Sequence, residues 1–552
     1  MLRPSLPAFA LPAFALLAAL SSPPAWAAAQ PPTHGPVVSE VRPDSAIIWA
    51  RAPGPGTLEL RVHPNPGHKQ KLMLRKVDAS HDQTAHWQLL GLTPGRTYMV
   101  EVTYEDPDGW RSDPVEATFH TAPLQIIPAE VRFAMSGDLG GQGRCRRVGS
   151  SDATSGYPIF SEIAALQPDF FIMNGDQIYA DGTCPAEGPD PNELHMPWTN
   201  LPGPSVSVAD ERVLWTERPT VRQIYWEHWR YNRGERHYQE LLRRTAFYAQ
   251  WDDHEIINDQ GASWSRWNPS SAQRPGYEIL TQVATSAWHD YNPVEAEVRG
   301  RGGLYRSFRW GRDVELFLVD ARTFRSLNTA PDTSEDNKTL LGEEQKSWLI
   351  SNLKASEATW KIVSVDVPLA QPTGSRPEEN GHDGWANGSE TPAEQANEAA
   401  ERTGFERELL GLLRELDAAH VRNLVFLSTD VHFAQISRFS LDLDGDGDPL
   451  VLHEVIAGPL SAGASPAVTP DPTLHPDVLF AEGGLFNFAY FIADRQGGEP
   501  TLTVEIRGED GKVRPGGKLV INAVEPERKL QNLKEELPSL KGAREGEARD
   551  RP

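Results

Sequence analysis

The first part of the chain follows a strand-and-turn pattern. Apolar residues recur at every second position, as in Leu58, Leu60 and Val62, and Pro-Gly turn signals such as Pro94-Gly95 separate the runs. A period of two is typical of half-buried strands, and short strands between frequent turns are typical of an antiparallel sandwich. Residues 35–122 are therefore predicted to form a small all-β domain, and we find no cluster of catalytic residue types in this stretch.

The pattern changes after a proline-containing linker at 123–128, and residues 129–522 are predicted to form a second domain. Apolar strands there alternate with helical runs, which predicts a layered α/β fold with mixed sheets. Several strands end directly in Asp or His, and open α/β folds place their sites at such strand ends. The strands are expected at 131–135, 170–173, 245–251, 316–319, 361–365 and 424–427, and amphipathic helices are expected at 157–166 and 405–416.

Both ends of the chain differ from these domains. Arg3, the apolar stretch 8–20 and Ala25-Trp26-Ala27 form the pattern of a cleaved signal peptide over residues 1–27, and an uncleaved anchor is the alternative. No paired arginines are present, so general secretion to the periplasm or the exterior is favoured over twin-arginine export. Residues 523–552 are highly charged and are expected to be a frayed helix or a disordered tail.

Composition narrows the classes of partner. The 552 residues carry a formal net charge of −24, which repels nucleic-acid backbones and anionic membranes at long range. An acidic protein that acts on phosphates must create a local positive site, and bound cations are the direct means. The apolar stretch near the N-terminus is followed by no other long apolar run, so we expect no membrane span in the mature chain and no stable nucleic-acid binding. A monomer is expected.

The chain has two cysteines, Cys145 and Cys184. An oxidising compartment permits a disulfide between them. A free thiol or a metal ligand is the alternative at either position.

Acidic residues follow the first two α/β strands. Asp138 precedes a glycine-rich segment, although Ser-Gly-Asp is also a common turn. Asp176 stands three residues before Tyr179, a spacing that can place both oxygens on one cation, and a phenolate is a known ligand of ferric iron. The alternative is a helix N-cap carboxylate followed by a core tyrosine.

Two further clusters lie later in the chain. In Trp251-Asp252-Asp253-His254-Glu255, four ionisable residues follow an apolar strand, where burial is costly without metals or partners. Asp253 can supply a metal ligand, and His254 can stabilise or protonate a leaving oxygen, whereas an exposed charged loop is the alternative. Asp430 and His432 alternate on an extended segment and can chelate one ion, although such pairs are often only hydrogen-bonded.

Taken together, these side chains come from four separate strand ends. Oxygen-rich ligands with one imidazole suit calcium, magnesium or manganese, or ferric iron beside the tyrosine. Two adjacent cations would provide a metal-bound hydroxide that attacks phosphorus in line and would neutralise a phosphoryl oxygen. The predicted metal ligands are Asp138, Asp176, Tyr179, Asp253, Asp430 and His432, and the predicted catalytic residue is His254.

The order strand-Asp, Gly-Asp-x-x-Tyr, Asp-His-Glu and Asp-x-His resembles the calcineurin-like metallophosphoesterases, and more closely their alkaline phosphatase D (PhoD) family. The segments 251–255, 320–326 and 341–349 are similar to signatures of that family, and residues 92–98 resemble the tyrosine-corner segment of fibronectin type III domains. The resemblance covers about residues 35–521. It implies a four-layer metallophosphoesterase sandwich behind a fibronectin type III-like domain.

The resemblance also implies cofactors and roles. Ferric iron and calcium are expected, with manganese, magnesium or zinc as alternatives. Asp138, Asp176, Tyr179 and His432 would hold the iron, and Asp176 would bridge to a second metal beside Asp253 and Asp430. Some relatives have cysteine where Asp138 stands. The additional metal-binding histidine of the wider superfamily is missing, and Asp366 stands in that region.

The predicted activity is hydrolysis of phosphate monoesters or diesters. A phospholipase D-like activity on lipid head groups is the alternative, and a non-catalytic calcium-binding surface protein is a further one. Arg322 and Arg325 could hold substrate phosphate by bidentate contacts, or could form structural ion pairs. The acidic run at 442–448 resembles a short calcium loop without its closing Glu, and an acidic hairpin turn is favoured there.

Overall fold

The structure is a computed structural model that describes residues 28–63, 71–188, 199–261, 275–333, 337–388 and 402–524. The predicted signal peptide, residues 1–27, lies outside the described residues, as does the predicted tail from residue 525 onward. Within the described part, no helix is both long and apolar enough to cross a membrane.

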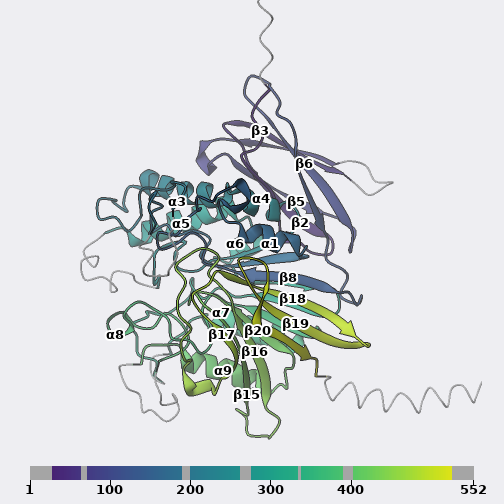
Figure 1. Ribbon diagram of the computed structural model, residues 1–552, viewed down its shortest axis with the longest axis vertical. Coiled ribbons are helices and arrows are strands. Elements are labelled where there is room, and N and C mark those ends of the chain that lie inside the picture. Colours follow the sequence, from purple (N-terminus) through teal and green to yellow (C-terminus); the bar gives the residue numbers. More distant parts are fainter. Residues whose placement is uncertain are drawn as a thin grey trace, which may run out of the picture.

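The N-terminal part is the predicted antiparallel sandwich, which stands at one end of the molecule (Figure 1). One face pairs three strands and the other face pairs four, in the order β4-β3-β6-β7. The hydroxyl of Tyr98 accepts a hydrogen bond from the amide of Thr93 at 2.8 Å, which is the tyrosine corner expected from the sequence. The strands are β1 (His34–Ser39), β2 (Ser45–Arg51) and β5 (Thr84–Leu90), facing β3 (Gly56–His63), β4 (Lys71–Val77), β6 (Thr97–Glu105) and β7 (Val115–His120).

The first sheet of the α/β part continues from this sandwich. Its central strands β8, β9 and β10 are parallel, and β1 of the sandwich extends the sheet through one parallel pair, Ser39 with Phe247. The sheet has the order β20-β19-β18-β8-β9-β10-β1-β2-β5. The added strands are β8 (Val131–Ser136), β9 (Phe170–Asn174), β10 (Ala246–Gln250), β18 (Asn487–Gln496), β19 (Glu499–Gly508) and β20 (Val513–Asn522).

The second sheet of the α/β part has the order β11-β12-β13-β14-β16-β15-β17. Strands β12, β13, β14 and β16 run parallel, β11 and β15 are antiparallel to their neighbours β12 and β16, and β17 is antiparallel to β15. The strands are β11 (Arg306–Trp310), β12 (Val314–Leu318), β13 (Trp360–Ser364), β14 (Leu424–Ser428), β15 (Ala434–Leu441), β16 (Leu450–Ile456) and β17 (Asp477–Glu482).

The two sheets pack face to face, and helices cover their outer faces (Figure 1). Residues of both sheets, including Phe133, Phe170 and Trp310, share one core, with the Phe170 and Trp310 ring centroids 5.0 Å apart. A second core lies under α1, α3, α4 and α5, and a third lies under α7 and α9. The α/β part is therefore the four-layer sandwich that was predicted.

The helices follow the expected amphipathic pattern. In α9, Leu409, Leu412, Leu413 and Leu416 are buried against the second sheet, as the spacing of apolar residues requires. The α-helices are α1 (Ile159–Ala165), α3 (Arg218–Arg233), α4 (Arg236–Leu242), α5 (Tyr277–Tyr291), α6 (Ala296–Gly300), α7 (Glu343–Ala355), α8 (Pro377–Asn380) and α9 (Glu406–Asp417), and short 3₁₀ turns are η1 (Ala79–His81), η2 (Asp152–Thr154) and η4 (Pro472–Leu474).

Candidate metal centre

Four predicted ligands lie just beyond the carboxyl ends of β8, β9 and β14. Asp138, Asp176, Asp430 and His432 all have positive φ, between 50° and 68°. Side-chain-bearing residues adopt this left-handed conformation rarely, and such positions concentrate at functional sites. At each of these turns the backbone bends sharply away from the strand, and the side chain remains at the junction of the two sheets.

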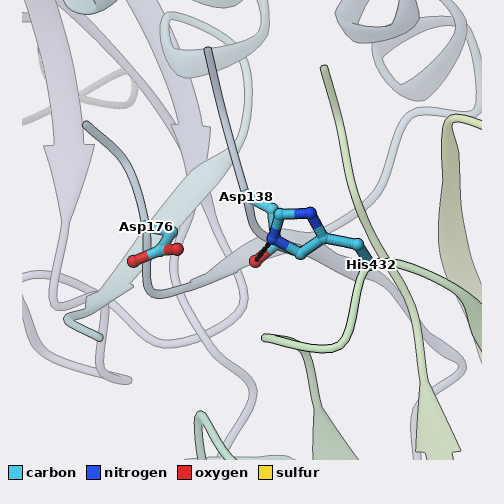
Figure 2. Close-up of side chains that lie close together, drawn as sticks. All are labelled: Asp138, Asp176 and His432. Atoms are coloured by element: carbon cyan, nitrogen blue, oxygen red, sulfur yellow. Dashed lines mark ion pairs between the residues drawn. The ribbon is translucent and has the colours of Figure 1, made fainter. Parts of the chain in front are cut away.

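Asp138, Asp176 and His432 form the first group. One ligand atom from each lies within 4.8 Å of the others, and all three side chains are buried. Figure 2 shows the His432 ring beside the Asp138 carboxylate, with Asp176 next to them. The distance from His432 Nε2 to Asp138 Oδ1 is 3.7 Å. Residues separated by almost 300 positions in the sequence are thus close enough to share one cation.

Hydrogen bonds orient His432 for ligation. Its Nδ1 donates to the carbonyl oxygen of Gly463 at 2.5 Å, while Nε2 lies 3.0 Å from the hydroxyl of Tyr179. Burial lowers the pKa of His432 to about 4, so the ring is neutral at ordinary pH. A neutral imidazole whose Nδ1 is held by a carbonyl presents its Nε2 lone pair to a metal.

The ring of Tyr179 packs closely between Gly141 and His254. A Cβ atom at Gly141 would lie 2.4 Å from two atoms of the Tyr179 ring. On another side the ring centroid is 4.0 Å from that of His254. Burial and the neighbouring carboxylate of Asp176 raise the pKa of Tyr179 well above its ordinary value, so a phenolate at this position requires a cation to balance it.

Asp176, Asp253 and His254 form a second group, whose ligand atoms also lie within 4.8 Å of one another. Asp176 belongs to both groups. Its Oδ1 accepts a hydrogen bond from the backbone amide of His254 at 3.2 Å, and His254 Nε2 lies 3.8 Å from Asp253 Oδ1. The first sheet therefore brings the ends of β9 and β10 together at one carboxylate.

Asp181 orients His254, and the sequence patterns alone did not identify this role. Its Oδ1 lies 2.7 Å from His254 Nδ1, and its Oδ2 accepts from the amide of Asn258 at 2.8 Å. Burial alone would lower the pKa of His254, but the carboxylates of Asp181, Asp253 and Asp176 raise it well above its ordinary value. With Nδ1 engaged by Asp181, the Nε2 of His254 is directed away from that carboxylate.

Glu255 connects the loop that follows β9 to the loop that follows β10. Its carboxylate accepts from the backbone amides of Asp176, Gln177 and Asp252, at 3.1, 2.6 and 2.8 Å. The sequence predicted a charged cluster at 251–255 but not this bracing role. The sequence did contain a sign of this role. Glu255 stands two residues after the predicted ligand Asp253, and a buried carboxylate needs hydrogen-bond donors.

Several buried carboxylate oxygens have no hydrogen-bond partner in the described part of the chain. Both oxygens of Asp138 and one oxygen of Asp253 are of this kind. Burial, followed by the charge of Asp252, raises the pKa of Asp138 well above its usual range. Clustered, buried and unpartnered acids are costly, and cations among them would remove that cost. The residues present therefore fit metal ions.

Asp430 follows β14 but is in neither group of three. Burial and then the charges of Asp252 and Asp253 raise its pKa well above the usual range, which places it within the electrostatic reach of the same carboxylates. The end of β14 thus contributes two acidic or imidazole side chains to this edge, Asp430 and His432.

The structure places Arg322 and Arg325 differently from a phosphate-binding pair. Arg322 has no exposed side-chain surface and forms ion pairs with Asp366 at 2.8 Å and Asp383 at 2.6 Å, and also with Asp252. Arg325 pairs with the same Asp383. Both guanidinium groups are buried and paired with carboxylates, so the two arginines form structural ion pairs, which was the alternative given from the sequence. Asp366 is likewise engaged with Arg322.

A disulfide joins Cys145 and Cys184. Cys145 follows the loop that carries Asp138, and Cys184 follows the segment that carries Tyr179 and Asp181. The bond therefore connects the segments that leave β8 and β9 beside the metal centre.

Comparison with known proteins adds the family. The family model of the PhoD-like phosphatases matches residues 145–481, more than half of the chain. The chain belongs to the PhoD-like phosphatase family. The matched segment includes Asp176 and His432, whereas Asp138 precedes it and reaches the site through β8.

This PhoD-like phosphatase is 22% identical over 463 residues to alkaline phosphatase D from Bacillus subtilis (strain 168), covering 79% of this chain and 70% of that protein. A solved structure of PhoD superposes with a TM-score of 0.66 at 15% identity, covering 90% of this chain and 93% of the other. Purple acid phosphatase PPD1 from yellow lupin gives 0.53 at 13% identity, covering 90% and 74%. The structural matches show a common fold, and the family makes the chain a phosphoesterase of the hydrolase class.

Proposed function

We propose that this PhoD-like phosphatase is an exported, metal-dependent hydrolase of phosphoric esters. One observation carries the proposal: two groups of ligand atoms share Asp176 at the junction of the two sheets. A carboxylate that belongs to both groups could serve a pair of adjacent cations. The acceptors of Asp138 and Asp253 that lack hydrogen-bond partners support the same conclusion.

The assignment of ligands follows the two groups. In this proposal ferric iron and calcium are the cations. Tyr179 joins the first group through its contact with His432 Nε2, and Asp430 joins the second group by family resemblance. The iron side would be held by Asp138, Asp176, Tyr179 and His432, and the second side by Asp176, Asp253 and Asp430.

When bound, the cations supply positive charge that activates a water and offsets charge on the phosphoryl oxygens. The chain itself supplies the proton. In this proposal His254, held by Asp181 through Nδ1, carries the proton on Nε2 and donates it to the leaving oxygen of the ester. His432 is neutral and fixed by Gly463, which suits it to hold a cation rather than to move a proton.

Export is supported by two features. Residues 1–27 carry the pattern of a cleaved signal peptide. The Cys145–Cys184 disulfide is of a kind that persists in oxidising compartments such as the periplasm or the exterior.

The test compares hydrolysis of p-nitrophenyl phosphate and bis-p-nitrophenyl phosphate by wild type, His254→Ala and Asp176→Ala. We expect His254→Ala to lower kcat by about 10²–10⁴-fold, and Asp176→Ala to abolish both turnover and tight metal binding. His475→Ala, which removes an exposed histidine outside both groups, is the matched control. The ratio of the two substrates assigns monoester or diester preference. Unchanged turnover in both site variants would refute the proposed function.

A further inference from the structure

The acidic run at 442–448 forms the hairpin connection between β15 and β16, as the sequence favoured. Leu441 pairs with Leu450 across its base. The catalytic edge of the same sheet is at the other end, where Ser428 pairs with Ile456. Leu450 and Ile456 are six positions apart along β16, which corresponds to about 20 Å. The hairpin is therefore remote from the metal centre, and Figure 1 labels β15 at the end of the molecule opposite the sandwich.

The hairpin has the first half of a calcium loop. Asp442, Asp444 and Asp446 occupy the first, third and fifth positions and Gly447 the sixth, with φ of 86°. These are the acidic and glycine positions of calcium-binding loops. The twelfth position, where a calcium loop has glutamate, is His453 in this chain, and it already lies within β16.

A buried carboxylate from another element lies against the hairpin. Asp417 is the last residue of α9, and it is 1% exposed. Its Oδ2 accepts from the amides of Leu443 and Asp444 at 2.6 and 3.2 Å, so the carboxylate points into the hairpin. Its Oδ1 is buried and has no hydrogen-bond partner within the described residues. Ligand atoms of Asp417, Asp442 and Asp444 lie within 4.8 Å of one another.

The charges around the hairpin leave these three acids unbalanced. Asp448 pairs with Arg422 and His420, and Asp446 lies 3.9 Å from His420. In the described part of the chain, Asp417, Asp442 and Asp444 form no ion pair with a lysine or arginine. The neighbouring Arg414 donates to the carbonyl oxygen of Leu443. A buried anion at a helix C-terminus is also opposed by the helix dipole. A bound cation would offset both the repulsion among the unpaired acids and the unfavourable interaction of Asp417 with the helix dipole.

We propose that the β15–β16 hairpin binds one calcium ion through Asp417, Asp442 and Asp444. The oxygen-only ligands suit calcium, which accepts irregular oxygen coordination, better than magnesium, which demands a near-ideal octahedron. The ion links the end of α9 to the β15–β16 edge and thereby fixes the hairpin. The site is separate from the metal centre, so hydrolysis does not depend on it.

The experiment measures calcium bound per chain by equilibrium dialysis at about 1 mM calcium, in the range used by extracellular calcium modules. We compare the full mature protein with the variant Asp442→Asn/Asp444→Asn, which changes two exposed side chains. The control Asp108→Asn/Asp113→Asn removes the same charge from exposed positions in the sandwich. We expect the hairpin variant to bind one calcium fewer per chain than both wild type and control, with hydrolysis unchanged.

Hydrogen exchange locates the ion independently. Calcium should slow amide exchange in peptides spanning 442–448 and the end of α9 in wild type and control, and should have no effect there in the hairpin variant. Equal calcium stoichiometry in all three proteins would overturn the proposal, as would calcium-independent exchange of the hairpin in wild type. Loss of hydrolysis is a separate result that concerns the metal centre, so the two proposals fail by different observations.

Discussion

Gly141→Ala tests whether the packing of Tyr179 matters for turnover. The added Cβ would lie 2.4 Å from Cε1 and Cζ of the ring and 2.5 Å from Cδ1. Carbon atoms in contact are separated by about 3.5 Å, so the ring must retreat by about 1 Å. The 3.0 Å contact between the Tyr179 hydroxyl and His432 Nε2 would then be lost. Displacements of about 1 Å in an active site can cost about 100-fold in rate.

The assay is kcat/KM for bis-p-nitrophenyl phosphate together with the metal content of the same sample. Gly182→Ala is the matched control, because its Cβ would meet atoms of the same tyrosine at 3.5 and 3.7 Å, which is ordinary contact. We expect Gly141→Ala to lose about 100-fold and Gly182→Ala to resemble wild type. Circular dichroism verifies that both fold. Wild-type turnover and metal content in a folded Gly141→Ala protein would refute the importance of Tyr179 placement.

Three further outcomes are expected. Asp181→Ala should lower kcat by about 10–100-fold with little change in KM, because it removes the group that orients His254, and Asp181→Asn should recover part of the loss; an unchanged kcat for Asp181→Ala contradicts this role. Arg322→Met should destabilise the fold by about 3–5 kcal/mol in urea unfolding, since it leaves buried carboxylates unpaired; equal stability would mean that those acids are balanced elsewhere. Reducing the Cys145–Cys184 bond, which spans 39 residues, should cost about 4 kcal/mol, and an unshifted unfolding midpoint would contradict that.

Much of the fold follows from local pattern. Every strand expected from an apolar run in the α/β part forms, including β8, β9 and β14, because those runs are long enough to be buried on both faces. The pairing of β1 with β10 could not be predicted, since a strand at residues 34–39 carries no sign of which sheet it will join. The C-terminal strands β18 and β19 are similar cases, because their neighbours are set by long-range packing.

The site residues could be predicted where a carboxylate or imidazole directly follows an apolar strand in the sequence. Asp138 and His432 are brought within 3.7 Å, as strand-end residues of a layered α/β fold should be. The roles of Asp181 and Glu255 depend on loop conformation, which spacing alone does not define. For Arg322 the sequence left two roles open, and the choice between them depended on Asp383, which comes from a distant loop.

Side chains from separate strand ends are proposed to converge and hold the cations on which hydrolysis depends. Metal content and turnover can be followed in one sample while a chelator removes the metals and calcium and iron are then restored. Both quantities should fall together and recover together in wild type, whereas Asp176→Asn should recover neither. Full turnover in a sample from which all metal has been removed would contradict it.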